Sequence, residues 1–173
     1  MGMGKLKKHQ MTALKWSRDL ILLGLFVLII TWWQSRDLLE DDGSLVMANG
    51  NLVTLNSDVQ PLFTADKRTL VYFFAPWCKI CEASIGNLDA LEDPSLRIVK
   101  IALDYQSRNE VETFVNNNDV SGDVFLGTEH LKQQYQVPGY PTYYFLNEQR
   151  QVIGRSFGYS TTIGLKLKNY LNK

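Results

Sequence analysis

Apolar and polar residues form blocks along the chain that predict a strand, a helix and a second strand near its centre. Residues 69–75 and 97–103 are apolar runs rich in β-branched and aromatic side chains, which is typical of buried parallel strands. Between them, side chains recur at the spacing of three and four that gives a helix one apolar face, namely Ile80, Ala83, Ser84, Leu88 and Leu91. Pro94 ends this helix. The pattern predicts an α/β domain with a right-handed crossover between parallel strands.

The C-terminal half predicts further elements of the same domain. We expect helices at 109–117 and 129–136, and strands at 123–127, 142–147 and 151–158. The last two strands flank a polar turn at 148–150, which indicates an antiparallel hairpin. These elements together predict a central mixed sheet flanked by helices.

A final helix is expected to close the domain. Ser160 or Thr161 can serve as its N-cap. The helical spacing of Ile163, Leu167 and Leu171 predicts that these three side chains face the core.

Near the N-terminus, residues 20–35 carry no charge, and we expect a transmembrane anchor at 19–35. Sixteen helical residues span about 24 Å, and flanking side chains can cover the deficit against a bilayer core of roughly 30 Å. Basic residues precede the segment and acidic residues follow it, so residues 1–18 are expected in the cytoplasm and residues 36–173 outside it. A cleaved signal peptide would share this pattern, but no small-residue cleavage site follows the apolar run. After the anchor, residues 36–51 resemble a polar linker and 52–173 a single folded domain.

Charge separates the two ends of the chain. The formal net charge is zero, with 18 basic and 18 acidic residues. Residues 1–35 hold five Lys or Arg and one acid, which leaves 13 basic and 17 acidic residues in 36–173. A domain with this acidic balance offers no clustered cations for nucleic acid, and that class of partner is excluded.

The two cysteines, Cys78 and Cys81, lie where the strand at 69–75 passes into the helix. Unpaired N–H groups at a helix start stabilise a thiolate, so Cys78 is the expected nucleophile and Cys81 the resolving thiol. A structural zinc site needs about four ligands, and the chain has only two Cys and two His. A structural disulfide closing so short a loop would restrict the unfolded chain little. Redox work is therefore the favoured use, with no metal and no cofactor beyond the disulfide itself.

The segments FFAPWCKIC (73–81) and VPGYPTYYFLN (137–147) are similar to the thioredoxin superfamily, in which a Cys-X-X-Cys helix start faces a cis-proline loop. The resemblance covers about 52–171 and implies a thioredoxin-like fold. The extra helix and strand between Asp104 and Gly127, with the anchor, resemble the TlpA/ResA/DsbE-like branch, and within it ScsD-like proteins.

The resemblance implies a role for each matching residue. Cys78 attacks, Cys81 resolves the mixed disulfide, Trp77 shapes the surface beside the thiol, and Pro141, in cis, packs against the disulfide. The neighbouring substrate-binding surface would be formed by Tyr140, Pro76, Lys79 and Ile80.

The chain departs from the family where proton handling is concerned. Tyr72 stands at the position of a buried Asp in thioredoxin, and Ser84 at that of a Glu in many ResA-like proteins. Neither general base carries over. Glu82 directly follows Cys81 and is expected on another helix face, in solvent.

The expected function is a periplasmic, inner-membrane thiol-disulfide oxidoreductase that exchanges disulfides with exported cysteine-containing proteins. The resemblance favours a reductase, serving cytochrome c maturation or cysteine repair, with electrons from a DsbD-type membrane donor. The alternative is a binding module that holds copper or an apo-protein through the two sulfurs without turnover, since Cu(I) prefers soft thiolate ligands.

Overall fold

The computed structural model describes residues 18–30, 38–43, 47, 50–64 and 67–172, and the chain divides into two compact units, 1–36 and 37–173. In the first unit, residues 18–30 form a helix that exposes apolar side chains on every face. Within these described ranges, no helix has both the length and the apolar character needed to cross a membrane. The anchor expected at 19–35 extends beyond residue 30, so its second part lies outside the described residues.

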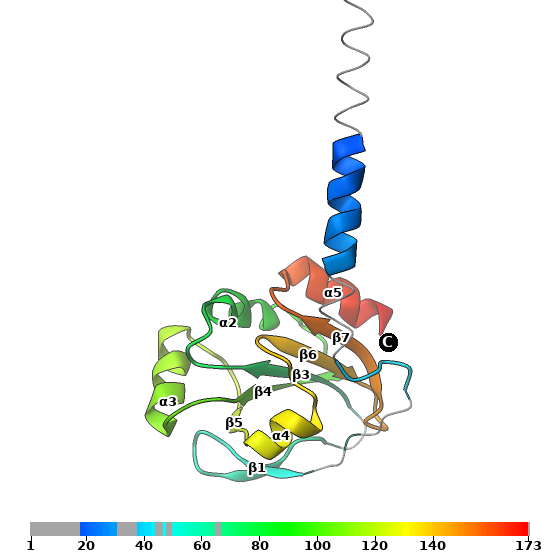
Figure 1. Ribbon diagram of the computed structural model, residues 1–173. Coiled ribbons are helices and arrows are strands. Elements are labelled where there is room, and N and C mark those ends of the chain that lie inside the picture. The colour runs from blue at the N-terminus through cyan, green and yellow to red at the C-terminus, as the bar shows by residue number, and fades with distance from the viewer. Residues whose placement is uncertain (1–17, 31–37, 44–46, 48–49, 65–66, 173) are drawn as a thin grey trace, which may run out of the picture. The chain divides into compact units, whose positions relative to one another are not determined.

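The second unit is built on a five-stranded mixed sheet, in the order β5-β4-β3-β6-β7 (Figure 1). Its strands are β3 (Arg68–Phe74), β4 (Leu96–Ala102), β5 (Val124–Leu126), β6 (Thr142–Leu146) and β7 (Val152–Phe157). Strand β3 lies in the middle, parallel to β4 and antiparallel to β6. The predicted mixed sheet, the parallel pair and the hairpin are therefore confirmed.

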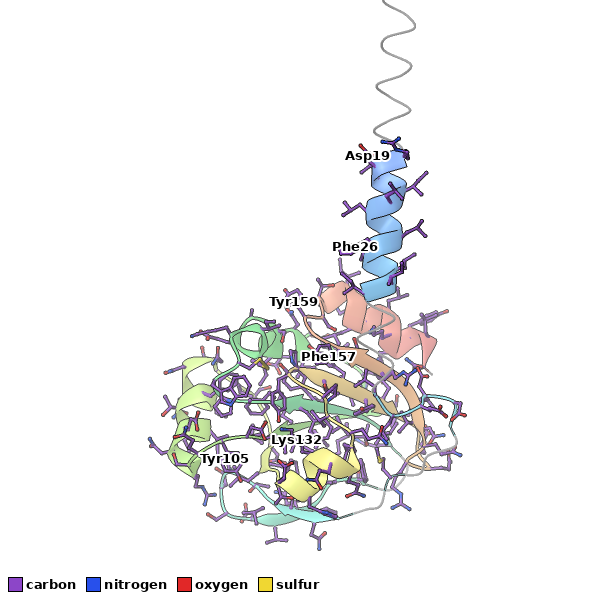
Figure 2. The ribbon with its side chains drawn as sticks, in the orientation of Figure 1. Asp19, Phe26, Tyr105, Lys132, Phe157 and Tyr159 are labelled. Carbon is purple, nitrogen blue, oxygen red and sulfur yellow. A yellow bond between two sulfur atoms is a disulfide. The ribbon has the colours of Figure 1, made fainter. Side chains whose placement is uncertain are left out.

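Strand β3 is buried along its whole length because helices cover both faces of the sheet. Helices α2 (Lys79–Ser84) and α5 (Thr162–Leu171) lie over one face, and α4 (Glu129–Gln134) over the other (Figure 1). Side chains fill the space between these layers (Figure 2). The continuous apolar run in β3 is what a strand buried on both sides requires.

The helix that follows the cysteines is shorter than the sequence predicts. Helix α2 ends at Ser84 and continues as a 3-10 turn, η1 (Ile85–Leu88), so Leu91 lies beyond it. Gly86 and Asn87, both poor helix formers, occupy this turn. Leu88 and Leu91 are nevertheless buried, as their spacing predicts.

The insertion between β4 and α4 is confirmed as helix α3 (Arg108–Asn117) followed by β5. A two-stranded ribbon that the sequence pattern did not predict, β1 (Asn51–Val53) and β2 (Val59–Pro61), precedes the sheet. Thr54, just after β1, forms an isolated bridge with Phe125 of β5. The ribbon thus extends the sheet at its β5 edge.

The predicted core face of the last helix is wrong. Thr161 caps α5, as one of the two expected residues, by accepting a hydrogen bond from the Gly164 N–H. However, Ile163, Leu167 and Leu171 are 79%, 56% and 69% exposed, and the helix buries Leu165 and Asn169 instead. The reason is that Asn169 makes two hydrogen bonds inside the domain. Its amide donates to Asp93 at 3.0 Å and accepts from the Arg68 guanidinium at 3.0 Å.

The segment expected to be a linker contributes to the core. Leu38, Leu39 and Met47 are buried, and the Arg155 guanidinium donates to the backbone carbonyls of Leu38 and Leu39 at 2.9 and 2.8 Å. The boundary expected at 51/52 is therefore too late, because three apolar side chains before it pack against the domain.

Candidate active site

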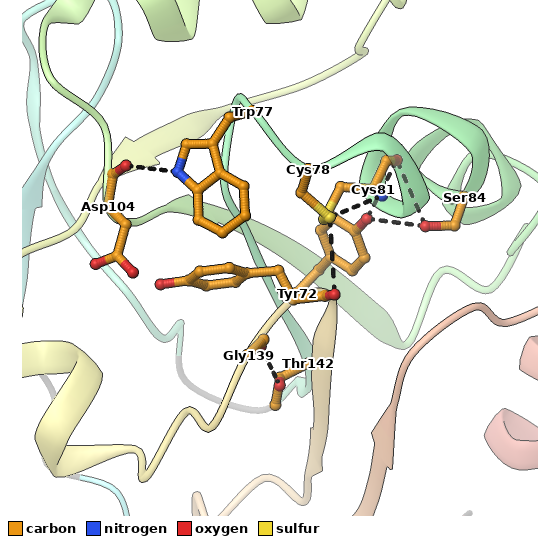
Figure 3. The surroundings of a disulfide bond; sticks show 9 residues. Tyr72, Trp77, Cys78, Cys81, Ser84, Asp104, Gly139 and Thr142 are labelled. Atoms are coloured by element: carbon orange, nitrogen blue, oxygen red, sulfur yellow. Dashed lines mark hydrogen bonds between the residues drawn. A yellow bond between two sulfur atoms is a disulfide. The ribbon is translucent and has the colours of Figure 1, made fainter.

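The two cysteines form a disulfide at the junction between β3 and α2 (Figure 3). Cys78 is the N-cap of α2, as the sequence predicts, and its Sγ accepts a hydrogen bond from the Cys81 N–H at 3.1 Å. The Cys78 N–H donates a hydrogen bond to the Ala75 carbonyl at 3.0 Å, and this closes a turn between the end of the strand and the first cysteine. The strand-to-helix transition therefore fixes both sulfurs on rigid backbone.

The two cysteines differ in their access to a partner. Cys78 is 7% exposed, whereas Cys81 is completely buried. An incoming disulfide can therefore reach the first sulfur but not the second. This asymmetry is the one that a nucleophile and a resolving thiol require.

The proline loop lies against the disulfide. The Tyr140-Pro141 bond is cis, as the resemblance implies, and the Tyr140 carbonyl oxygen lies 3.7 Å from Cys78 Sγ. Two hydrogen bonds hold the loop. Thr142 Oγ1 donates to the Gly139 carbonyl at 2.8 Å (Figure 3), and the Gly158 N–H donates to the Pro141 carbonyl at 2.8 Å. The structure thus brings together the two motifs that are about sixty residues apart in sequence.

The expected substrate-binding residues surround Cys78. Trp77 is 60% exposed, Ile80 is half exposed, and Lys79 lies in solvent where it pairs with Glu82 at 2.8 Å. Pro76 lies at one end of a cleft of about 420 Å³ between the start of α2 and helix α3. Glu82 is on the surface, as expected, and does not approach the buried side of the disulfide.

Four side chains form a cluster beside Cys78 that sequence reasoning found only in part. The Trp77 indole N–H donates to the Asp104 carbonyl at 2.9 Å, and the Trp77 and Tyr140 rings meet edge to face at 5.7 Å. Lys132 of α4 pairs with the Asp104 carboxylate at 2.6 Å and lies 5.9 Å from the centre of the Tyr140 ring. One feature of the sequence could have predicted Asp104: it directly follows a predicted strand, at the same sheet edge as the cysteines. No feature of the sequence indicated Lys132.

Neutral hydroxyl groups lie behind the buried cysteine. The Tyr72 and Ser84 hydroxyls are 3.1 Å apart, and Ser84 Oγ donates to the Cys81 carbonyl at 3.4 Å (Figure 3). The Tyr143 ring packs edge to face on Tyr72 at 4.9 Å. Burial raises the pKa of the Tyr72 hydroxyl far above its usual range, so this group stays protonated. The positions of the family acids are therefore filled by hydrogen-bonding groups that carry no charge.

In the described part of the chain, the two sulfurs are the candidate ligands for a metal ion. Among the described residues, no group of three or more His, Cys, Asp or Glu side chains is gathered where it could hold a metal ion. A soft ion such as Cu(I) would have the reduced Cys78 and Cys81 thiolates as ligands.

The sheet order and the paired cysteines beside a cis-proline loop give the chain a thioredoxin-like fold. Solved structures with the same fold include StoA from Bacillus subtilis, with a TM-score of 0.63 and 23% identity, covering 72% of this chain and 98% of that one. A putative thiol:disulfide interchange protein DsbE from Chlorobium tepidum has a TM-score of 0.68 and 16% identity, covering 77% and 99%.

The chain is also similar in sequence to a thioredoxin-like protein. It is 26% identical to the thioredoxin-like protein YneN of Bacillus subtilis over 105 residues, which is 57% of this chain. The match spans 62% of the length of that relative. No protein-family model matches the chain.

Proposed function

We propose that the chain is a thiol-disulfide oxidoreductase that exchanges disulfides with cysteine-containing proteins outside the cytoplasm. The observation that carries the proposal is the disulfide itself, with Cys78 slightly exposed, Cys81 fully buried behind it and the proline loop 3.7 Å from the first sulfur. Structural neighbours whose names describe disulfide exchange support the same activity.

The geometry accounts for each bond that exchange requires. The reduced Cys78 thiolate attacks a partner disulfide, a new bond forms between Cys78 and one partner sulfur, and the other partner sulfur leaves as a thiolate. Cys81, whose Cα lies 5.2 Å from that of Cys78, then attacks Cys78 Sγ, and the second partner sulfur leaves. Two electrons pass to the partner, and the Cys78-Cys81 disulfide forms again. The same steps in reverse would oxidise a partner.

Binding of the partner is expected at the surface around Cys78. The proline loop places the Tyr140 carbonyl 3.7 Å from Cys78 Sγ, so an extended partner segment could pair with backbone beside the sulfur. Trp77, just before Cys78, and Ile80, in the first turn of α2, offer exposed apolar surface beside the Cys motif. Such a site favours partners that present a cysteine in an extended, accessible segment.

We infer that the enzyme works as a reductase anchored to the inner membrane and facing the periplasm. The direction rests on the resemblance to TlpA/ResA/DsbE-like proteins, which also suggests a DsbD-type donor that would reduce the Cys78-Cys81 pair. The location rests on the apolar helix at 18–30, the uncharged run that continues to residue 35, and the excess of basic residues before it.

Activity is tested with the purified full chain and two single variants. The wild type should speed the reduction of a protein disulfide by an external thiol, and Cys78→Ser should abolish this turnover. Cys81→Ser should still attack but should not release its partner, so mixed disulfides should accumulate and be identifiable by mass. Tight Cu(I) binding without any turnover would instead favour the binding module.

Location is tested separately from activity. A reporter fused after the C-terminus should be active only outside the cytoplasm, and the chain should stay in the membrane fraction after an alkaline wash. Recovery of a shortened soluble form would show that the apolar segment is cleaved and would overturn the anchor.

A further inference from the structure

Asp104 occupies an unusual backbone position next to the cysteines. It follows β4 and has a φ of +49°, in the left-handed region that few side chains adopt. In this conformation its carbonyl accepts the Trp77 indole N–H at 2.9 Å (Figure 3). Its carboxylate pairs with Lys132 at 2.6 Å. One residue therefore connects the loop after β4 to both the Cys motif and α4.

Lys132 extends this connection to the proline loop. It belongs to α4, on the other side of the sheet from α2, and is labelled in Figure 2. Its ammonium group lies 5.9 Å from the centre of the Tyr140 ring, within the range of a cation–π interaction. The side chains of Lys132 and Asp104 are 27% and 30% exposed, so solvent screens the pair only in part.

The two aromatic rings held in this way form one side of the entrance to Cys78. Trp77 is largely exposed, and an exposed indole without a hydrogen bond would sample several rotamers. The Asp104 carbonyl and the edge of the Tyr140 ring restrict it, and Tyr140 itself precedes the cis-proline. A partner side chain that packs on rings already in place loses less conformational entropy on binding.

We propose that Asp104 and Lys132 are positioning residues that fix the Trp77 and Tyr140 rings beside Cys78, and that this aromatic wall selects partner proteins with an apolar side chain next to the attacked cysteine. The inference rests on the proposed disulfide exchange and adds a substrate class to it. Neither residue touches the sulfurs, so both act through the rings.

The test compares two peptides that differ only in the residue after a cysteine, Leu in one and Ser in the other. Each cysteine carries a chromophoric aromatic thiol as a mixed disulfide, so attack by the reduced full chain releases a coloured thiolate. The wild type should have a higher second-order rate constant for this single oxidation by the Leu peptide than by the Ser peptide. Asp104→Asn and Lys132→Met should lower that preference about fivefold, the upper range for a partly exposed ion pair.

Two controls separate positioning from a general loss of structure. Glu112→Gln removes one partner of a similar ion pair on α3, Arg108–Glu112 at 3.4 Å, which touches neither ring, and should keep the wild-type preference. The rate at which iodoacetamide alkylates Cys78 should not change in Asp104→Asn or Lys132→Met, because a reagent this small does not need the wall. If Asp104→Asn fails to fold, Lys132→Met carries the test.

The outcomes are distinct. An unchanged Leu preference in folded Lys132→Met, or no preference in the wild type, would overturn the positioning role. Failure of the wild type to react with either peptide would overturn the proposed exchange activity, and the substrate class with it.

Discussion

Tyr72 and Ser84 fill the buried side of the active site with hydroxyl groups instead of a carboxylate. Their oxygens are 3.1 Å apart, and Ser84 also reaches the Cys81 carbonyl. This pair can hold the first turn of α2 in place and can pass hydrogen bonds between neutral groups. It cannot take up a proton as a carboxylate would, so the proton that Cys81 loses on attack must leave by another route.

Tyr72→Phe should therefore act mainly on stability. Loss of one buried hydrogen bond should lower the free energy of unfolding by about 1 kcal/mol, measured by urea denaturation. Tyr135→Phe is the matched control, because this buried hydroxyl has no hydrogen-bond partner within the described part of the chain. Its removal should leave stability unchanged or raise it, and a loss equal to that of Tyr72→Phe would contradict the assignment.

Asp93 makes the stability of the fold depend on pH in the acid range. Hydrogen bonds from Ser95 and Asn169, with the Arg68 guanidinium 2.9 Å away, hold the pKa of this carboxyl well below its usual range. The folded-state pKa is thus lower than the unfolded value of about 3.9. The ionised carboxylate stabilises the fold fully above that unfolded value, and this stability is lost as the pH falls through the lowered folded-state pKa.

Asp93→Asn should remove this dependence. At neutral pH it should cost about 3–5 kcal/mol, since Arg68 would keep a buried charge without its partner. The difference from the wild type should shrink as the pH falls below about 4, where the wild type begins to lose the same contribution. Denaturant titrations from pH 7 to pH 2.5 measure it, with the exposed neighbour changed in Glu92→Gln as the control. A difference that stays constant with pH would refute the linkage.

Among the elements, α5 shows how periodicity can select the wrong face of a helix. Ile163, Leu167 and Leu171 recur as an apolar stripe, yet the buried positions are Leu165 and Asn169, which share the same spacing. Hydropathy cannot rank Asn169 as a core residue, because its burial depends on Arg68 and Asp93 in distant segments. The strand-to-helix junction at Cys78 was predictable because all its determinants are local.

A pair of matched substitutions tests which face of α5 is buried. Leu165→Ala should lower the free energy of unfolding by about 2–5 kcal/mol, as truncation of a fully buried leucine does. Leu167→Ala, two residues away and mostly exposed, should change it by less than about 0.5 kcal/mol. Thermal or urea unfolding of both variants is sufficient, and the reverse order of effects would restore the face expected from the sequence.

At the scale of the whole molecule, the sequence predicted what local pattern determines and missed what distant contacts determine. The mixed sheet and the inserted α3–β5 unit followed from runs of apolar residues. The meeting of Cys78 with Pro141 followed from the resemblance of two motifs to the thioredoxin superfamily. The Asp104–Lys132 pair did not, because it depends on a left-handed loop residue and on the packing of α4. The packing of Leu38 and Leu39 on the domain was missed for the same reason. Their neighbours in sequence are acidic and include a glycine, which is typical of a linker, and the contact with Arg155 involves a distant segment.

Two truncated chains test where the domain begins. A chain starting at residue 37 keeps the whole second unit and should unfold with the stability of the intact domain. A chain starting at residue 51 loses Leu38, Leu39 and Met47, each worth about 1.5–3 kcal/mol of burial, and should be less stable by several kcal/mol. Equal stability of the two chains in urea would show that the earlier segment is dispensable.

The central place of β3 in the sheet also sets the order in which a nascent chain can complete its fold. Thr69 in β3 pairs with Leu146 in β6, and Arg68 at its start donates to the Asn172 carbonyl at 3.0 Å. A ribosome that has released only the residues up to β5 has supplied one neighbour of β3 and left its other edge open. During synthesis this apolar edge must stay shielded from other chains until β6 and β7 emerge, because an open edge of a sheet invites wrong pairing. Resistance to protease should accordingly rise late in elongation, and in one step.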